Sequence, residues 1–289
     1  MHTWALANQK GGCGKTTTAV NLAAALAALG KRVLLVDLDP QSHATMALGH
    51  SIDSGPSLTQ VLCDGAPMEG VVRTAPGGFH LAPANGSLVE FEEIAERMIA
   101  PEGVLAGALA TVADRYDHAV LDCPPRADGV LCANAVRASD TVLLVVETGA
   151  FALQGALRAR EIFEELASEV GRTIDLRVLA TLFDRRTRFA REVLIAMHAR
   201  FGEAMFETAI RQSVRLREAA AFGVPVRELD SSCRSAAEFD ALAREALAWS
   251  RAVQPAPRLV VDEPGEPRCR AAEVDEREID PALPKTRTS

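Results

Sequence analysis

The chain has 289 residues, of which 48% are hydrophobic and 24% charged, a balance typical of soluble globular proteins rather than disordered chains. Its 39 acidic and 31 basic side chains give a formal net charge of -8, which excludes a uniformly basic nucleic-acid-binding surface and leaves only a local basic patch possible. The sequence has no secretory signal and no apolar run of about 18 residues that could span a membrane. Its six cysteines form no CxxC pair, so we expect a cytoplasmic protein.

Short apolar runs alternate with helical patterns along the chain. The predicted strands are 3–7, 32–37, 118–122, 141–146 and 176–182. The predicted helices are 15–29, 129–138, 152–170, 188–200 and 236–253. This alternation predicts an α/β fold with a mostly parallel, twisted sheet and helices on both of its faces. The Gly- and Pro-rich segment 42–100 is less regular, and we expect it to elaborate the sheet rather than form a separate domain.

The last 35 residues, 255–289, differ in composition from the rest of the chain. They contain six prolines and fourteen charged side chains, with few large apolar residues. Such a segment cannot bury enough apolar surface to offset the entropy lost on ordering. We therefore predict one folded domain over 1–254 and a disordered tail over 255–289.

A glycine-rich loop follows the first predicted strand and precedes the first helix, as a P-loop requires. It reads Asn8-Gln9-Lys10-Gly11-Gly12-Cys13-Gly14-Lys15-Thr16-Thr17. The glycines allow successive backbone N–H groups to point at phosphate oxygens, and the positive end of the following helix adds to their attraction. Lys15 would reach the β- and γ-phosphates and the Thr16 hydroxyl would ligate Mg²⁺. The strict GxxxxGK[ST] pattern fails at one position, where Gln9 replaces the first glycine.

Carboxylates end two of the other predicted strands. Asp37 and Asp39 follow one apolar run, and Asp122 ends another. In an open parallel sheet, ligands bind beyond the carboxyl ends of the strands, where carboxylates can hold Mg²⁺ and orient an attacking water. The sequence therefore predicts an ATP-binding site with magnesium at this edge of the sheet.

Several motifs together resemble the ParA/MinD family of deviant Walker-A ATPases, in order along about residues 3–250. Lys10 to Thr17 resembles the family's KGGxGKTT, and Val36 to Gln41 its VDxDPQ. Further matches are Asp122 to Pro125 with DCPP, Phe151 to Gly155 with FALEG, and Val214 to Ala219 with the VRLxEA stretch of the Soj-like partition proteins.

The resemblance implies a Mg²⁺-dependent ATPase that forms a homodimer around two ATP molecules and separates after hydrolysis. It implies that Lys10 is the signature lysine, which reaches the partner copy's nucleotide, while residues 10–17 bind the nucleotide. Lys15 keeps its P-loop role, Asp39 orients or activates the hydrolytic water, and Thr16, Asp37 and Asp122 surround Mg²⁺. A centromere-binding (ParB-like) or cargo adaptor protein is expected to stimulate hydrolysis.

Cys13 stands where the family more commonly has valine. Beside Lys15 and a helix N-terminus its thiol could have a lowered pKa and be reactive. We favour the simpler interpretation, a small residue tolerated at a permissive position.

One window of the chain is basic. Between 185 and 217 there are eight arginines and three glutamates, so this window carries +5 and the rest of the chain -13. Arginine-rich clusters favour phosphate recognition, although a solvated helix face is the commoner explanation of a charge cluster. Together with the resemblance, the window predicts non-specific, salt-dependent DNA binding and association with the nucleoid in the ATP state. The candidate residues are Arg186, Arg188, Arg215 and Arg217.

Other functions remain open from the sequence. A MinD-type membrane regulator needs a C-terminal amphipathic helix, which the acidic, proline-rich tail does not provide. An iron–sulfur relative needs bridging cysteines, and the spacing of Cys123 and Cys132 matches no cluster pattern. Similar ATPases also position chemoreceptor clusters and cellulose-synthesis machinery or act on small molecules. Sequence-specific operator binding is not expected, since no helix-turn-helix precedes the P-loop.

Overall fold

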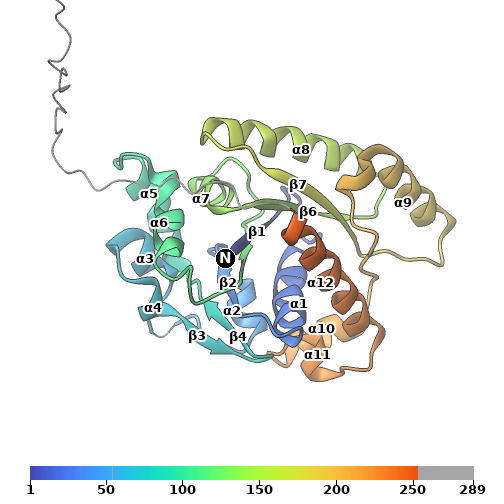
Figure 1. Ribbon diagram of the computed structural model, residues 1–289, viewed down its shortest axis with the longest axis horizontal. Helices are drawn as coiled ribbons and strands as arrows, with labels where there is room; N and C mark the ends of the chain where they lie inside the picture. The colour runs from blue at the N-terminus through green and yellow to red at the C-terminus, as the bar shows by residue number, and fades with distance from the viewer. Residues whose placement is uncertain (54, 253–289) are drawn as a thin grey trace, which may run out of the picture. The chain divides into compact units, whose positions relative to one another are not determined.

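A computed structural model describes residues 1–53 and 55–252 of the chain. The predicted tail, 255–289, lies outside these residues. A seven-stranded sheet runs through the described part in the order β3-β4-β2-β5-β1-β6-β7 (Figure 1). The strands are β1 (His2–Ala7), β2 (Val33–Asp37), β3 (Arg73–Ala75), β4 (Phe79–Ala82), β5 (His118–Asp122), β6 (Thr141–Glu147) and β7 (Asp175–Thr181).

All neighbouring strands pair in parallel except β3, which joins β4 as an antiparallel edge. The carboxyl ends of β1, β2, β5 and β6 therefore lie along one edge of the sheet. Asp37 and Asp122 are direct register partners at the ends of β2 and β5. The central strands are buried on both faces, as the unbroken apolar runs of the sequence predict.

Helices cover both faces of the sheet. Along β1, Trp4 and Leu6 face one core and Ala5 and Ala7 face the other. The first core is closed by α1 (Lys15–Ala28), α2 (His43–Ala47), α10 (Val214–Ala221), α11 (Val226–Leu229) and α12 (Arg234–Ala252). The second is closed by α3 (Leu58–Asp64), α4 (Met68–Val71), α5 (Glu90–Ala95), α6 (Val104–Ala110), α7 (Val130–Ala138), α8 (Ala152–Glu169) and α9 (Arg188–Phe201). Short 3-10 turns span Gly86–Val89, Pro101–Gly103 and Gly202–Ala204.

The predicted α/β class is confirmed, with strand and helix boundaries within about two residues of the predicted ones. A glycine follows the end of helix α1, where Gly30 adopts a left-handed φ of 78° and its N–H donates to the carbonyl of Ala27. The irregular segment 42–100 does elaborate the sheet, because it supplies β3 and β4. Within the part of the chain that the structure describes, no helix is long and apolar enough to cross a membrane.

Candidate nucleotide-binding site

The loop between β1 and α1 is curled and fixed at several points. Gly12 and Gly14 have φ values of 76° and 93°, in the left-handed region that glycine enters without strain. At its start, the Asn8 amide donates to the carbonyl of Val145 on β6 at 2.7 Å. At its end, the Thr181 hydroxyl of β7 donates to the carbonyl of Cys13 at 2.6 Å. Two neighbouring strands thus hold the loop in its phosphate-binding shape.

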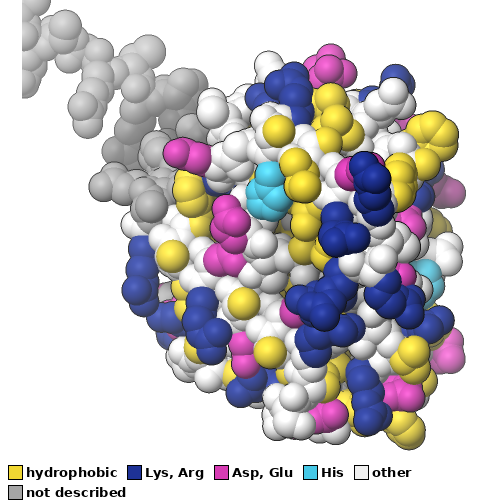
Figure 2. All heavy atoms as spheres, turned by 90° about the vertical axis from the view of Figure 1, so that its right-hand side faces the viewer, with side chains coloured by type: hydrophobic (Ala, Val, Ile, Leu, Met, Phe, Trp, Pro, Cys, Tyr) yellow, Lys and Arg dark blue, Asp and Glu magenta, His cyan; other side chains and the backbone are white. Residues whose placement is uncertain are grey.

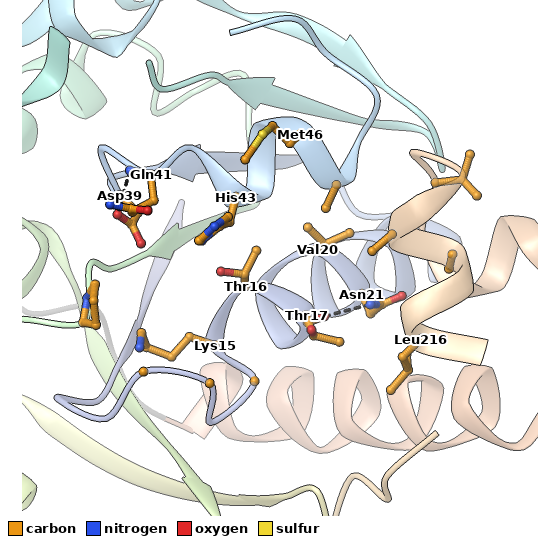
Figure 3. A pocket seen from close by; sticks show the side chains of 18 residues that line it. Lys15, Thr16, Thr17, Val20, Asn21, Asp39, Gln41, His43, Met46 and Leu216 are labelled. Atoms are coloured by element: carbon orange, nitrogen blue, oxygen red, sulfur yellow. Dashed lines mark hydrogen bonds between the residues drawn. The ribbon is translucent and has the colours of Figure 1, made fainter. Parts of the chain in front are cut away.

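Lys15 begins α1 and points into a cavity of about 650 Å³, to which Thr16 and Asp39 also turn (Figure 3). The Lys15 side chain is buried, and its ammonium donates to the carbonyl of Lys10 at 3.3 Å. No carboxylate among the described residues forms an ion pair with it. A buried cation that lacks an anionic partner is suited to receive an anionic ligand.

The strand-end carboxylates Asp37 and Asp39 behave differently from each other. Asp37 is fully buried and accepts hydrogen bonds from the Thr45 N–H at 2.8 Å, the Thr45 hydroxyl at 2.7 Å and the Asp39 N–H at 3.2 Å. Burial raises the pKa of Asp37 to about 6, although these hydrogen bonds oppose the rise. Asp39 lines the cavity, and one of its oxygens accepts from the N–H of Gln41 at 2.9 Å. Asp37 therefore holds the segment that presents Asp39.

Asp122 is the carboxylate whose environment best fits a cation. It is completely buried, and neither of its oxygens has a hydrogen-bond partner within 1–53 or 55–252. Burial and the neighbouring Asp37 raise its pKa well above the ordinary value, while the nearby Thr16 hydroxyl and Lys15 ammonium oppose the rise. A cation supplied by a ligand would satisfy these oxygens.

No group of three or more His, Cys, Asp or Glu residues that could hold a metal occurs in the described segments. Magnesium at nucleotide sites needs no such cage, because phosphates and water complete its shell around one or two protein ligands. The orphaned oxygens of Asp122 beside Thr16 fit that arrangement.

The far end of the cavity is apolar. Val20 of α1 and Leu216 and Ala219 of α10 line it (Figure 3). A smaller cavity of about 180 Å³ opens between the P-loop residues Gly14 and Thr17 and the start of α10. Phosphate-binding and apolar walls thus adjoin, as a nucleotide with a charged tail and a planar base requires.

Comparison with known proteins identifies the family of the chain. A protein-family model described as an AAA domain matches residues 1–176. The chromosome-partitioning ATPase Soj of Thermus thermophilus is 42% identical over 245 residues, which are 84% of this chain and 94% of that protein. The chain belongs to the ParA/Soj family of P-loop ATPases. The chromosome partitioning protein ParA of Caulobacter vibrioides is 35% identical over 87% of this chain and 96% of its own length. An uncharacterized protein of Pseudomonas putida is 37% identical over 86% and 95%.

Solved structures show the same fold. Cobyrinic acid a,c-diamide synthase from Mycobacterium smegmatis, with bound ADP and magnesium, gives a TM-score of 0.76 at 29% identity and covers 89% of this chain and 98% of that one. Apo McdA from Cyanothece gives 0.74 at 25% identity, covering 86% and 99%.

Lys10, which the resemblance predicts to be the signature lysine, lies at the surface. Lys10 does not line the cavity, and its side chain is 63% exposed. Its ammonium donates to Glu147 at the end of β6. Lys10 and Lys15 thus stand on opposite sides of one loop, one directed outward and one inward.

Cys13 does not have the environment of a reactive thiol. The side chain is fully buried, and burial raises the pKa of its thiol more than Lys15 lowers it. A buried, protonated thiol is a poor nucleophile. The hypothesis of a lowered pKa is therefore wrong, and the interpretation of Cys13 as a small packing residue is supported.

Figure 2 shows Lys and Arg side chains gathered on one face of the molecule. The four predicted arginines lie in α10 and at or just before the start of α9. Three of them pair with carboxylates: Arg186 with Asp184, Arg188 with Glu192, and Arg215 with Glu218 and Asp230. Arg217 is exposed and lines a groove of about 530 Å³. The other arginines that line this groove are Arg185, Arg186, Arg211 and Arg234.

Sequence reasoning did not identify several residues of the site. Thr181 and Thr45 hold the P-loop and Asp37 through hydroxyl hydrogen bonds, and Glu147 pairs with Lys10. Each lies far along the chain from its partner or carries no motif of its own. Arg211 and Arg234, which line the groove, both form ion pairs with Glu238. Arg211 lies within the basic window of the sequence. Arg234 lies outside that window and reaches the groove only because of the position of α12.

Proposed function

We propose that the chain binds and hydrolyses ATP with Mg²⁺ and that its nucleotide state controls dimerisation. The observation that carries this proposal is the cavity beside the curled P-loop that buried Lys15, Thr16 and Asp39 line, with the unpartnered carboxylate of Asp122 close to Thr16 and Lys15. The buried ammonium of Lys15 lies near Asp122 without forming an ion pair in the described residues, and the oxygens of Asp122 accept no hydrogen bond there, so Mg²⁺-bound phosphates would complement both groups. Each group separately is unfavourable to bury, and together they are complementary to one ligand.

The protein groups have distinct roles in the proposed reaction. Backbone N–H groups of residues 11–17 and the Lys15 ammonium bind the phosphates and fix their orientation. The Thr16 hydroxyl and Asp122, with Asp37 beside it, would hold Mg²⁺, which would neutralise charge developing on the phosphates. Asp39 orients the attacking water and accepts its hydrogen bond from within the cavity. Lys10 acts on the nucleotide of a second copy in a homodimer.

Substitution of Lys15 tests the catalytic part of this proposal. Lys15→Ala should abolish ATP binding, measured by fluorescent-nucleotide titration, and ATP hydrolysis, measured by phosphate release. Lys31→Ala is the matched control, since it removes a lysine outside the cavity, and it should behave as wild type. Hydrolysis that survives Lys15→Ala unchanged would overturn the proposal.

We further propose that the ATP-bound dimer binds DNA non-specifically and serves in partition of a chromosome, a plasmid or another large cargo. The groove lined by Arg185, Arg186, Arg211, Arg217 and Arg234 supports this, because it gathers planar cations in a concave surface. Arg188 and Arg215 would add further phosphate contacts. Like Arg186, Arg211 and Arg234 in the groove, they pair with carboxylates that a phosphate would have to replace. We expect such a protein to lie in the cytoplasm and to associate with the nucleoid in its ATP-bound state. A ParB-like or cargo adaptor protein would stimulate its ATP hydrolysis.

Paired substitutions distinguish the effect of the groove arginines from the effect of the protein's net charge. Arg185→Ala with Arg217→Ala should weaken DNA retention in the ATP state and reduce its salt dependence by about one unit of slope per lost phosphate contact. Arg158→Ala with Arg160→Ala, on α8, removes the same charge elsewhere and should change little. Equal DNA affinity of both pairs would count against the groove. Retention on anionic vesicles without retention on DNA would instead favour the MinD-type alternative.

A further inference from the structure

The signature lysine is engaged within its own chain. The Lys10 ammonium donates to the carboxylate of Glu147, the last residue of β6. The contact is built into the fold, because the Lys10 N–H donates to the Asn8 side chain at 3.1 Å and the Asn8 amide donates to Val145 at 2.7 Å. Asn8 thus fixes the start of the P-loop to β6, and Glu147 lies two residues beyond that attachment.

This ion pair lies at an open surface rather than inside the nucleotide cavity. The side chains of Lys10 and Glu147 are 63% and 33% exposed. Both line a separate cavity of about 290 Å³, together with Phe151, which is 78% exposed in the loop that precedes α8. An exposed aromatic beside a cavity and a removable ion pair is suited to contact with a second copy of the chain.

We propose that Glu147 is a competing partner for Lys10 that sets the threshold for ATP-dependent dimerisation. Lys10 cannot give its full charge to the partner copy's phosphates while it is bound to Glu147, so the pair must break when the dimer forms. Glu147 acts only through Lys10 and is a positioning residue. This inference rests on the proposed ATP-bound dimer.

The size of the effect follows from the exposure of the pair and the symmetry of the dimer. An exposed ion pair contributes roughly a 1.4- to 5-fold bias in favour of its closed form. A symmetric dimer breaks two such pairs, so the dimer dissociation constant should be higher by roughly 2- to 25-fold than without them. Salt screens the ion pair, so the difference should shrink at high ionic strength.

The test is the dimer dissociation constant of the full chain with a non-hydrolysable ATP analogue and Mg²⁺, measured by sedimentation velocity. Glu147→Gln should tighten the dimer by roughly 2- to 25-fold. Glu164→Gln is the matched control, because it removes the same charge from an exposed pair with Arg160 on α8 and should leave the constant unchanged. In a Lys10→Ala background, Glu147→Gln should give no gain.

Three results would overturn the inference. A wild-type chain that dimerises with the analogue while Glu147→Gln dimerises no more tightly would overturn it alone. A gain of full size in the Lys10→Ala background would show that Glu147 acts without the lysine. A wild-type chain that remains monomeric with the analogue would overturn the proposed dimer as well.

Discussion

Neutralising Asp122 should stabilise the nucleotide-free protein while it removes its response to Mg²⁺ and ATP. The carboxylate is completely buried, and neither oxygen has a hydrogen-bond partner in the described structure. A buried polar group left unpaired costs about 1–3 kcal/mol, and more when it is charged. Asp122→Asn keeps the shape and a polar group but removes the buried charge and its repulsion from Asp37, so at a pH where Asp122 is ionised the free energy of unfolding should rise by about 1–3 kcal/mol. In a domain of this size that corresponds to a Tm increase of about 2–12 °C.

Mg²⁺-ATP should reverse the order of stability, so that wild type becomes more stable than Asp122→Asn. At about 100 times its Kd, Mg²⁺-ATP adds about 2.7 kcal/mol to the stability of the wild-type protein, and the variant, without a charged metal ligand, should gain much less. The pH dependence has a definite sign. Since burial raises the pKa of Asp122 in the folded state, wild type takes up a proton as pH falls through that pKa. Its disadvantage relative to Asp122→Asn should therefore shrink toward low pH.

Thermal unfolding with and without Mg²⁺-ATP measures both effects. Asp64→Asn, an exposed carboxylate at the end of α3, is the control and should shift stability by less than about 0.5 kcal/mol. An Asp122→Asn protein that is less stable than wild type without ligand would refute the reasoning about the orphaned charge. One that keeps the full response to Mg²⁺-ATP would refute the assignment of Asp122 to the metal.

Two further predictions concern buried polar groups that support the site's sheet. Burial lowers the pKa of His118 to about 4 from an unfolded value of 6.5, so stability from this group should fall by about 2 kcal/mol between pH 7 and pH 5. His118→Gln keeps an acceptor for the Trp4 indole and should reduce this pH-dependent loss of stability, measured by urea denaturation at pH 7 and pH 5. An unchanged loss between the two pH values would contradict the prediction. Thr45→Val removes the hydroxyl that donates to Asp37 and accepts from the Ala84 N–H, and should lower the free energy of unfolding by about 1–3 kcal/mol. A neutral effect in the same urea assay would show that these hydrogen bonds are replaced.

Much of the site could be predicted because its residues are adjacent in sequence. The P-loop from Lys10 to Thr17 is one continuous segment, and Asp37 and Asp122 end apolar runs that predict strands of one parallel sheet. The partners that fix these residues could not be predicted in the same way. Thr181 bonds Cys13 across 168 positions and Glu147 bonds Lys10 across 137, so both contacts depend on the order of β1, β6 and β7 in the sheet.

The arginines show a second limit of sequence reasoning. Their number in the window indicates a basic patch, but the pairing of each side chain decides its chemistry. Arg188 faces Glu192 one helical turn away, a contact that spacing alone could have suggested. Arg234 joins the groove from a helix that begins after the window, so only the tertiary fold places it there. The short elements within 42–100 fell below the length at which periodicity distinguishes helix from strand.

We propose above all that the bound nucleotide controls the DNA affinity of this protein. The most direct test is to measure its affinity for a non-specific duplex with ATP and with ADP. With wild-type protein at fixed salt, the ATP state should bind at least about 5-fold more tightly than the ADP state, and the difference should disappear in Lys15→Ala. Equal DNA affinity in the two nucleotide states would contradict the claim.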